Sequence, residues 1–518
     1  MRPSSSGCWG DLLSGSELSR LEEIVDASEV ARRIELFLPS GGRPRQLLVR
    51  TLLIAMLATQ ADHRPAHLTR VHQALIALDQ SDKVRLGVIV TWRHGPHLLT
   101  YRQVERTFHL VVTALSKPSP DGSPSGHLSF VLDALLESSV PERYKTGSGS
   151  LAVDWSDLES YSCPPIEKGG GCADPEASWG RRKSDQPGVK DELFFGYELQ
   201  AATMVPDEAG PDVPELARRI SLTTCAIDPP RAFVPVLVAM VASGVEVREV
   251  LSDSGYAHRK GEHWAAPVRG LGASIVTDLH PQDRGPRGTA MGAIISNGNL
   301  YCPATPKMLL GLGPLARSAS KDETAAHDTK SSELARYKLG RLTSDDADGY
   351  HRVACPAATG KVRCPLRPKS MALSHTRPEV SKPPSEPPDC CVQQTITVAP
   401  EVHLKTAQKH DYPSKAHRDS YARRTAVERT FSTVKDPASN DIARGWCRLM
   451  GLAPITLFLA CLFVVRNDRV LDAFEDRQAE QRRRLAAGMA PKTRRKRRRT
   501  LGELAASAPA NAPPTLLS

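Results

Sequence analysis

The chain has 518 residues and a mass of 56.3 kDa, which is more than one ordinary domain holds. Hydrophobic residues make up 40% and charged residues 24% of it, so most of the chain can bury a core and wholesale disorder is excluded. No apolar run reaches the roughly 18 residues of a membrane span, and the first residues lack the apolar core of a signal peptide. We therefore expect a cytoplasmic protein without a membrane partner.

The net charge of +10 is concentrated in one segment. Between Gln481 and Thr500 ten residues are basic and none is acidic. Removing these ten from 68 basic residues leaves 58, which balance the 58 acidic ones. Such a segment is typical of a contact with a polyanion, and nucleic acid is the partner that we favour. The alternative is a solvated tail that only aids solubility.

The first 145 residues are predicted to be mostly α-helical. Apolar side chains recur at helical spacing in residues 46–59 and 68–78. A third helix is predicted after Thr100, which suits an N-cap and precedes another apolar stripe. Several short helices in a row are typical of a helix-turn-helix DNA-binding region. They are equally compatible with plain helix packing.

The pattern changes after the Gly- and Ser-rich residues 146–150, where strands and helices begin to alternate. Strands are predicted at 151–156, 193–205, 219–227, 245–252 and 273–279, and helices at 233–243 and 263–270. Strands joined by turns should pair antiparallel, whereas strands joined through helices should add in parallel. We therefore expect an α/β fold, and its element order resembles that of the ribonuclease H-like fold, a mixed sheet with helices.

Residues 285–415 break this pattern and are predicted to be a β-containing insertion into the α/β core. Two stretches in it, 318–332 and 365–389, have the charged or Pro- and Ser-rich composition of disordered linkers. Two helices, one over 419–435 and a hydrophobic one over 449–465, are predicted to follow. The expected organisation is a helical N-terminal DNA-binding region at 1–145, a catalytic core at 146–284 and 416–475, the insertion between them, and a disordered basic tail at 476–518.

Five of the eleven cysteines fall in the predicted insertion: Cys302, Cys355, Cys364, Cys390 and Cys391. A disulfide framework is not expected in a long chain without a secretory signal. Cys355, Cys364 and the adjacent pair supply four thiols, enough for a structural Zn²⁺. Their spacing is not the usual Cys-x2-Cys, however, and adjacent cysteines rarely both ligate. Buried free thiols are therefore the favoured interpretation.

The most specific pattern lies in the helix predicted over residues 419–435. With 100° between successive residues, Tyr421, Arg424, Glu428 and Lys435 fall within a stripe of about 60°. A hydroxyl, two cations and a carboxylate therefore share one face, beside an apolar edge that can pack inward. A solvated helix with ordinary pairing of Arg424 and Glu428 has the same spacing.

This arrangement, Tyr-x2-Arg-x3-Glu-x6-Lys, resembles the signature of a large group of bacterial insertion-sequence transposases of the DDE class. In the same family pattern, Asp154 ends the first predicted strand and Asp253 follows the fourth. Glu198 stands in a Gly-Tyr-Glu-Leu stretch that resembles the family's Gly-Tyr-Lys-Leu, with Glu in place of the usual Lys. The resemblance covers roughly residues 145–466.

The resemblance implies a DNA transposase that hydrolyses DNA at the ends of a mobile element and joins them to target DNA. Such chemistry uses two hard cations, Mg²⁺ or Mn²⁺, about 3.5–4 Å apart and held by carboxylates. The expected catalytic residues and metal ligands are Asp154, Asp253 and Glu428, with Asp154 bridging both ions. Each also has a structural interpretation, because the two Asp suit turns and Glu428 suits an ion pair. Two rival acids, Asp157 and Asp191, lie off the strand end.

The resemblance further implies that Tyr421, Arg424 and Lys435 contact the DNA backbone near the cut. The expected partners are double-stranded DNA, both terminal inverted repeats and target, and a second copy of the chain on that DNA. Two alternatives stay open. One is a structure-specific endonuclease on the same fold, and the other is a catalytically inactive DNA-binding protein derived from a transposase.

Overall fold

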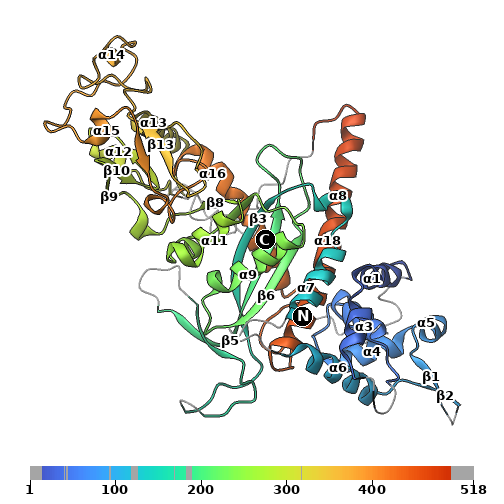
Figure 1. Ribbon diagram of the computed structural model, residues 1–518. Helices are drawn as coiled ribbons and strands as arrows, with labels where there is room; N and C mark the ends of the chain where they lie inside the picture. Colours follow the sequence, from blue (N-terminus) through green and yellow to red (C-terminus); the bar gives the residue numbers. More distant parts are fainter. Residues whose placement is uncertain are drawn as a thin grey trace, which may run out of the picture. The chain divides into compact units, whose positions relative to one another are not determined.

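The structure is a computed structural model that describes residues 15–39, 41, 45–92, 95–117, 126–167, 170–182, 190–316 and 318–491 (Figure 1). By the contacts among its residues, the chain divides into two compact units, Met1–Val470 and Leu471–Ser518. The first is a mixed α/β structure with a mixed sheet. No helix of the described ranges has the length and hydropathy of a membrane span.

The N-terminal residues are helical, as predicted, apart from one short hairpin. Their elements are α1 (Gly15–Ser28), α2 (Val30–Phe37), α3 (Val49–Ala61), α4 (Leu68–Ala77), α5 (Gln80–Arg85), β1 (Ile89–Trp92), β2 (Gly95–Leu98), α6 (Tyr101–Leu115), α7 (Gly126–Ser138) and α8 (Glu142–Lys145). The predicted N-cap of α6 is confirmed, because Thr100 and Gln103 form a capping box. The hairpin was not predicted, since each of its strands has only four residues.

The central sheet follows: β3 (Ser150–Glu159), β4 (Ser178–Arg182), β5 (Glu192–Val205), β6 (Ala217–Thr224), β7 (Glu249–Ser252) and β8 (Ser274–Thr277), with α9 (Pro229–Ala242), α10 (Ser254–Ala257), η2 (Gly261–His263) and α11 (Ala265–Gly270). The strands β4 and β6 both pair with β5, and the order continues as β5-β3-β7-β8. The predicted pairing is confirmed, because β3, β5 and β6 are antiparallel while β7 and β8 add in parallel.

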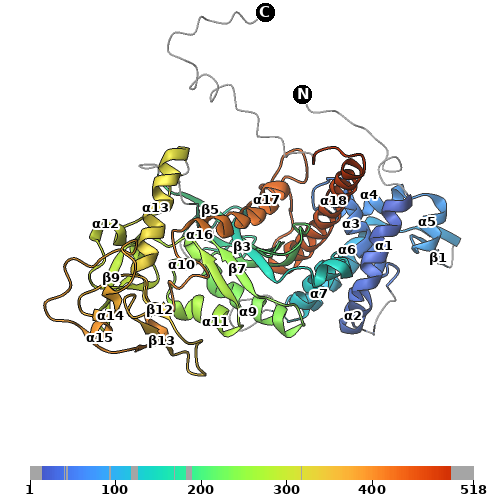
Figure 2. The same cartoon turned by 90° about the horizontal axis from the view of Figure 1, so that it is seen from above.

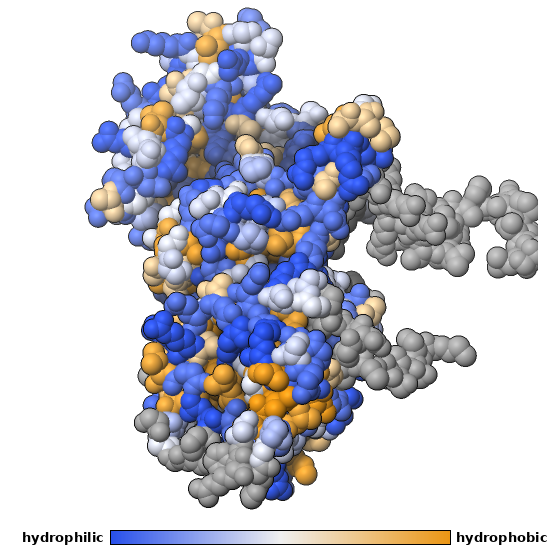
Figure 3. Space-filling model, turned by 90° about the vertical axis from the view of Figure 1, so that its right-hand side faces the viewer, coloured by the Kyte–Doolittle hydropathy of each residue, from blue (hydrophilic) through white to orange (hydrophobic). Residues whose placement is uncertain are grey.

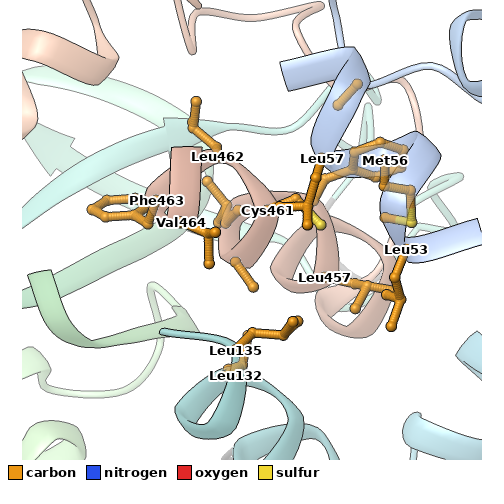
Figure 4. Close-up of a cluster of buried hydrophobic side chains, with 14 of the residues drawn as sticks. Leu53, Met56, Leu57, Leu132, Leu135, Leu457, Cys461, Leu462, Phe463 and Val464 are labelled. Carbon is orange, nitrogen blue, oxygen red and sulfur yellow. The ribbon is translucent and has the colours of Figure 1, made fainter. Parts of the chain in front are cut away.

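Both faces of the sheet are covered by helices. Figure 2 shows α17 (Thr425–Val434) on one side, and α9 and α11 on the other. The hydrophobic core on the α17 side also contains the N-terminal helices and the start of α18 (Leu452–Ala486). Figure 4 shows part of it, where side chains of α3 and α7 pack around Leu457 and Cys461 of α18. The region 1–145 therefore shares its core with the sheet.

The predicted hydrophobic helix is confirmed, but α18 continues beyond it to Ala486. The prediction of disorder is therefore wrong for residues 476–486. This segment is rich in Glu, Gln, Arg, Ala and Leu, whose high helix propensity outweighs the charged composition. Residues 492–518 of the predicted tail, with most of its basic cluster, lie outside the described residues.

On the face drawn in Figure 3, hydrophilic side chains predominate and hydrophobic ones form smaller groups.

The stretch predicted as an insertion holds two small antiparallel sheets, β9-β10-β11 and β12-β13-β14. The turn η3 (Pro281–Asp283) precedes this stretch. Its elements are β9 (Pro286–Ala290), β10 (Ala293–Ser296), β11 (Asn299–Tyr301), α12 (Lys307–Leu310), α13 (Lys321–Tyr337), β12 (Gly340–Arg341), β13 (His351–Ala354), α14 (Pro368–Met371), α15 (Asp389–Val392), β14 (Ile396–Val398) and η4 (Pro400–Val402).

Both linkers predicted as disordered have ordered structure. Residues 318–332 overlap α13, which starts with a capping box of Ser320 and Glu323 that the polar composition concealed. Residues 365–389 are irregular and include α14. The backbone of Arg363 holds this stretch on both sides of Glu379. The N–H of Arg363 donates to the Pro378 carbonyl, and the carbonyl of Arg363 accepts from the N–H of Val380, each at 2.8 Å.

Asn467 of α18 completes the hydrogen bonding of the sheet edge. Its Oδ1 accepts from the N–H of Ala217 and its Nδ2 donates to the Ala217 carbonyl, both at 2.8 Å. Nδ2 also donates to Oγ of Ser139 at 2.9 Å. All of these groups are buried. The side chain of Asn467 therefore makes the two hydrogen bonds to Ala217 of β6 that a neighbouring strand would otherwise make.

We predict that Asn467→Ala lowers the free energy of unfolding by about 2–3 kcal/mol, because it leaves the buried N–H and C=O of Ala217 unpaired. Chemical denaturation of both proteins measures this. The matched control is Gln393→Ala at an exposed position, which should change the free energy by less than about 0.5 kcal/mol. Equal stability of Asn467→Ala and the parent protein would contradict the role of this amide.

Candidate active site

Two acids stand at corresponding positions, one on β3 and one directly after the neighbouring parallel strand β7. The paired residues of β3 and β7 run up to Ala152 and Leu251, and two residues further along each chain lie Asp154 and Asp253. The prediction that Asp154 ends its strand is wrong, because β3 continues to Glu159. Its other edge stays paired with β5 throughout. What ends near Asp154 is the parallel pairing, so its carboxylate faces the segment that follows β7.

Backbone donors hold both carboxylates in place. Oδ1 of Asp154 accepts from the N–H of Trp155 at 2.9 Å. Oδ1 of Asp253 accepts from the N–H groups of Gly255 and Tyr256, at 2.8 and 3.3 Å, and so caps α10. Burial and the charge of Asp253 together raise the pKa of Asp154 to about 6. The two acids therefore repel each other in a half-buried pocket.

Aromatic packing fixes the turn that carries Asp253. The rings of Trp155 and Tyr256 are 4.8 Å apart between centroids, and Tyr256 and Trp264 are 4.5 Å apart. Gly255 lies against this group, since a Cβ at that position would come within 2.5 Å of the Trp155 ring. The chain can therefore approach the aromatic side chain only with glycine there.

The helix predicted over residues 419–435 is divided into three pieces. They are α16 (Lys415–Tyr421), the 3-10 turn η5 (Ala422–Arg424) and α17. Residues three apart eclipse each other in a 3-10 turn, so the guanidinium of Arg424 lies 5.6 Å from the centroid of the Tyr421 ring. The inner face of α17 is anchored on the sheet, where Oγ1 of Thr430 and of Thr203 are 3.0 Å apart.

The guanidinium of Arg424 links the first strand to the helix. Its Nη1 donates to Oδ2 of Asp154 at 2.9 Å, and its Nη2 donates to Oε1 of Glu428. The residue is only 8% exposed. Burial acts to lower the pKa of Arg424, but the charges of Tyr421, Asp154, Glu428 and Asp253 raise it above its usual range. The three predicted acids therefore all lie within electrostatic reach of one buried cation.

In this arrangement Arg424 offsets part of the negative charge of the acids. Among the described residues, no group of three or more His, Cys, Asp and Glu side chains is placed so that it could hold a metal ion. The Glu428 side chain is 48% exposed and turned toward Arg424. The structure thus brings Asp154 and Asp253 together through strand register, and adds Glu428 through the arginine.

Lys435, seven residues after Glu428, is the C-cap of α17 and pairs with a different acid. Its Nζ donates to Oδ1 of Asp157 at 3.1 Å. Nη2 of Arg182 also donates to Asp157, at 2.5 Å. The rival acid Asp157 is therefore paired.

Glu198 completes a second charged cluster that was not predicted from the sequence. It stands directly opposite Asp157 in the antiparallel register of β3 and β5. Burial and the charge of Asp157 raise the pKa of Glu198 to about 7, although Lys435 and Arg182 act to lower it. From the sequence, this pair could be found only through the register of β3 and β5, which places Asp157 and Glu198 side by side.

Both clusters line one cleft of about 920 Å³, in which Asp154, Asp157, Glu198 and Asp253 are accompanied by Trp155, Trp179, Arg181, Arg182, His258 and Arg259. The other rival acid, Asp191, is 3.6 Å from Arg181 at the edge of the sheet. No protein-family model matches the chain, and no curated protein matches it. Function is therefore inferred from the chemistry of this cleft.

We predict that Glu198→Gln gains stability over the parent protein as pH rises. The raised pKa means that the folded chain holds this proton more tightly than the unfolded chain between about pH 4.5 and 7, so the parent loses stability as pH rises through that window. Glutamine has no such loss. The difference in unfolding free energy should grow by on the order of 1–2 kcal/mol from pH 5 to pH 8.

Denaturation at a series of pH values measures this difference. Glu386→Gln, at an exposed position outside the cleft, is the matched control and should follow the parent protein at every pH. Parallel stability curves for Glu198→Gln and the parent would show that Glu198 is not strained by its surroundings.

Proposed function

We propose that this protein is a metal-dependent DNA transposase, which cuts DNA at the ends of a mobile element and joins them to a target. One observation carries the proposal. The acids that the sequence singled out, Asp154, Asp253 and Glu428, come from three distant segments and surround one arginine of the same signature, Arg424. An amphipathic surface helix would have no reason to bury that arginine against Asp154.

The topology supports a ribonuclease H-like core. Three antiparallel strands, β6, β5 and β3, are followed by the parallel β7 and β8, and helices pack on both faces. The stretch predicted as an insertion lies between β8 and α16. In such a core the first strand, the fourth strand and a following helix each contribute one acid, which is the origin of the three acids here.

The donor atoms fit a hard divalent cation. They are carboxylate oxygens, which Mg²⁺ and Mn²⁺ prefer. The repulsion that raises the pKa of Asp154 would be relieved by a cation shared with Asp253. We propose that Asp154 and Asp253 hold the cations with Glu428, after Glu428 leaves Arg424. A pair of bound Mg²⁺ ions would supply an activated nucleophile and neutralise the leaving oxygen.

The remaining groups of the cleft are suited to DNA. Released from the acids, Arg424 would donate both arms of its guanidinium to a phosphate, and Tyr421 packs beside it. Arg181, Arg259 and the exposed ring of Trp179 line the same cleft and would contact the backbone or stack on a base. Lys435 would contact the backbone of a DNA strand that passes Asp157.

The reaction is an in-line displacement carried out twice. Water first attacks the phosphodiester at the element end, the P–O bond to the 3′-oxygen breaks, and a 3′-hydroxyl is freed. That hydroxyl then attacks a phosphodiester of the target and loses its proton as the new P–O bond forms. The P–O bond to the target's own 3′-oxygen breaks in the same step, and this oxygen takes up a proton and leaves as a 3′-hydroxyl. Cutting and joining two ends requires that they be held together, so we propose a homodimer on DNA.

The N-terminal helices would bind the terminal repeats. Arg102 and Arg106 are exposed one turn apart on α6 and, with Arg45 and Gln103, line a hollow of about 270 Å³. Cations at this spacing can follow a phosphate backbone. The basic segment after Gln481 would add contacts that do not depend on DNA sequence.

We predict that Asp154→Asn abolishes Mg²⁺-dependent cleavage of end DNA, by on the order of 10³-fold or more, while binding to that DNA stays within about threefold. The change removes the charge that holds the cations and leaves the strand intact. The substrate carries the inverted repeat that the proposal predicts on either side of the coding DNA, identified by sequencing that DNA. Cleavage and gel-shift assays measure the two effects.

Asp191→Asn, at the sheet edge, is the matched control and should cleave within about twofold of the parent. Persistent cleavage by Asp154→Asn would show that the site is assigned wrongly. A second assay supplies an end with a free 3′-hydroxyl and scores joining to target DNA. Cleavage without joining would identify a structure-specific endonuclease, and binding without either reaction would identify an inactive DNA-binding protein. Both outcomes contradict the proposal.

A further inference from the structure

Four cysteines wall a small cavity inside the predicted insertion. The cavity measures about 10 Å³, which is room for roughly one water-sized sphere. Cys302, Cys355, Cys364 and Cys391 line it, and each is buried. The rest of the lining is apolar except for Arg367. A space for one small sphere among four sulfur-bearing side chains and one cation is unusual in a hydrophobic core.

Three of these cysteines share a local sequence, and two of them share a backbone turn. Cys302, Cys355 and Cys364 are each followed by proline. At Cys302 and Cys364 the chain then turns, because the cysteine carbonyl accepts from the N–H three residues on, at 3.0 and 2.9 Å. The N–H two residues after each of these cysteines, that of Ala304 or of Leu366, points at the sulfur. Such donors are typical partners of a metal-bound thiolate.

A cation stands beside the same cavity. Arg367 lines it together with the four cysteines. A positive charge at this place would stabilise the negative charge of sulfur ligands.

We propose that Cys302, Cys355, Cys364 and Cys391 bind one structural Zn²⁺ in a tetrahedral arrangement of four thiolates. Each thiol loses its proton to solvent, so one ion replaces four protons. As the described side chains stand, no such group could hold a metal, so binding requires the four cysteines to turn toward the centre of the cavity. The set differs from the one considered from the sequence, because Cys302 takes the place of Cys390.

A zinc ion at this place would stabilise a region whose own hydrophobic clusters are small. The strands of the two small sheets have between two and five residues, and the apolar side chains form two separate small clusters. Cys302, Cys355 and Cys364 belong to one cluster, and Cys391 to the other. One ion would therefore join both clusters and the four segments that carry its ligands. Small cores commonly need such a cross-link.

Cys390 provides a matched control. It is the neighbour of Cys391, it is equally buried, and it does not line the cavity. Cys390→Ser exchanges a buried thiol that is not a proposed ligand, whereas Cys391→Ser and Cys364→Ser each remove a proposed ligand.

The test is elemental analysis of the full chain, purified under reducing conditions from a zinc-supplemented culture. We expect about one zinc ion per chain in the parent protein and in Cys390→Ser, and at least a fivefold lower content in Cys364→Ser and Cys391→Ser. Zinc-free parent protein, or equal loss in Cys390→Ser and Cys391→Ser, would overturn the proposal.

A second measurement does not depend on the variants folding. The parent protein is loaded with Co²⁺ in place of Zn²⁺, and its absorption is recorded. Four thiolates should give intense sulfur-to-cobalt charge-transfer bands together with the visible bands of tetrahedral cobalt. A spectrum of octahedral cobalt, or thiols found paired as disulfides, would contradict the site. Neither measurement involves DNA, so its outcome is independent of the proposed transposase activity.

Discussion

A buried arginine between two carboxylates is the interaction on which the cleft depends. Arg424 reaches Asp154 on the first strand and Glu428 one turn further along its own chain segment. A guanidinium cannot shed its charge, so it is stable in a buried position only with partners. The position of α17 on the sheet is therefore tied to the acid on β3, and the long stretch between β8 and α16 has to return the chain to the same edge.

This interaction also explains how three acids can gather before any cation arrives. Asp154 on β3 and Asp253, directly after β7, are at corresponding positions, and their mutual repulsion adds to the cost of burying Asp154. One guanidinium offsets part of that cost and leaves the group with an excess of negative charge. In the proposed function a divalent cation would balance this excess, and the released arginine would contact a phosphate.

The second charged cluster extends the same cleft. Arg182 and Lys435 form ion pairs with Asp157, whereas the pKa of its neighbour Glu198 is raised to about 7. Arg181, Arg182, Arg259 and the exposed ring of Trp179 line the wall of the same cleft.

Local patterns in the sequence predicted what depends on local physics. The helical N-terminal region, the antiparallel-then-parallel strand order and the stripe holding Arg424 and Glu428 follow from periodicity, turns and spacing. The sequence could not predict that β3 continues past Asp154, because that depends on its pairing with β5. The 3-10 turn and the end of α17 decide that Lys435 meets Asp157. Likewise, only tertiary packing brings Cys302 beside Cys391.

Charged composition alone predicts disorder in two stretches that are helical in the structure. The start of α13 has a capping box, and the residues after Val465 have high helix propensity. Both local signals are visible in the sequence, and each outweighs a high charge content.

The most direct measurement is anomalous X-ray scattering from crystals of the protein with end DNA and Mn²⁺. The account predicts manganese bound to the carboxylates of Asp154, Asp253 and Glu428, with Arg424 turned from both of its acidic partners to a DNA phosphate. Manganese bound elsewhere, with Arg424 still joined to Asp154 and Glu428, would contradict the claim that these acids form one cation site.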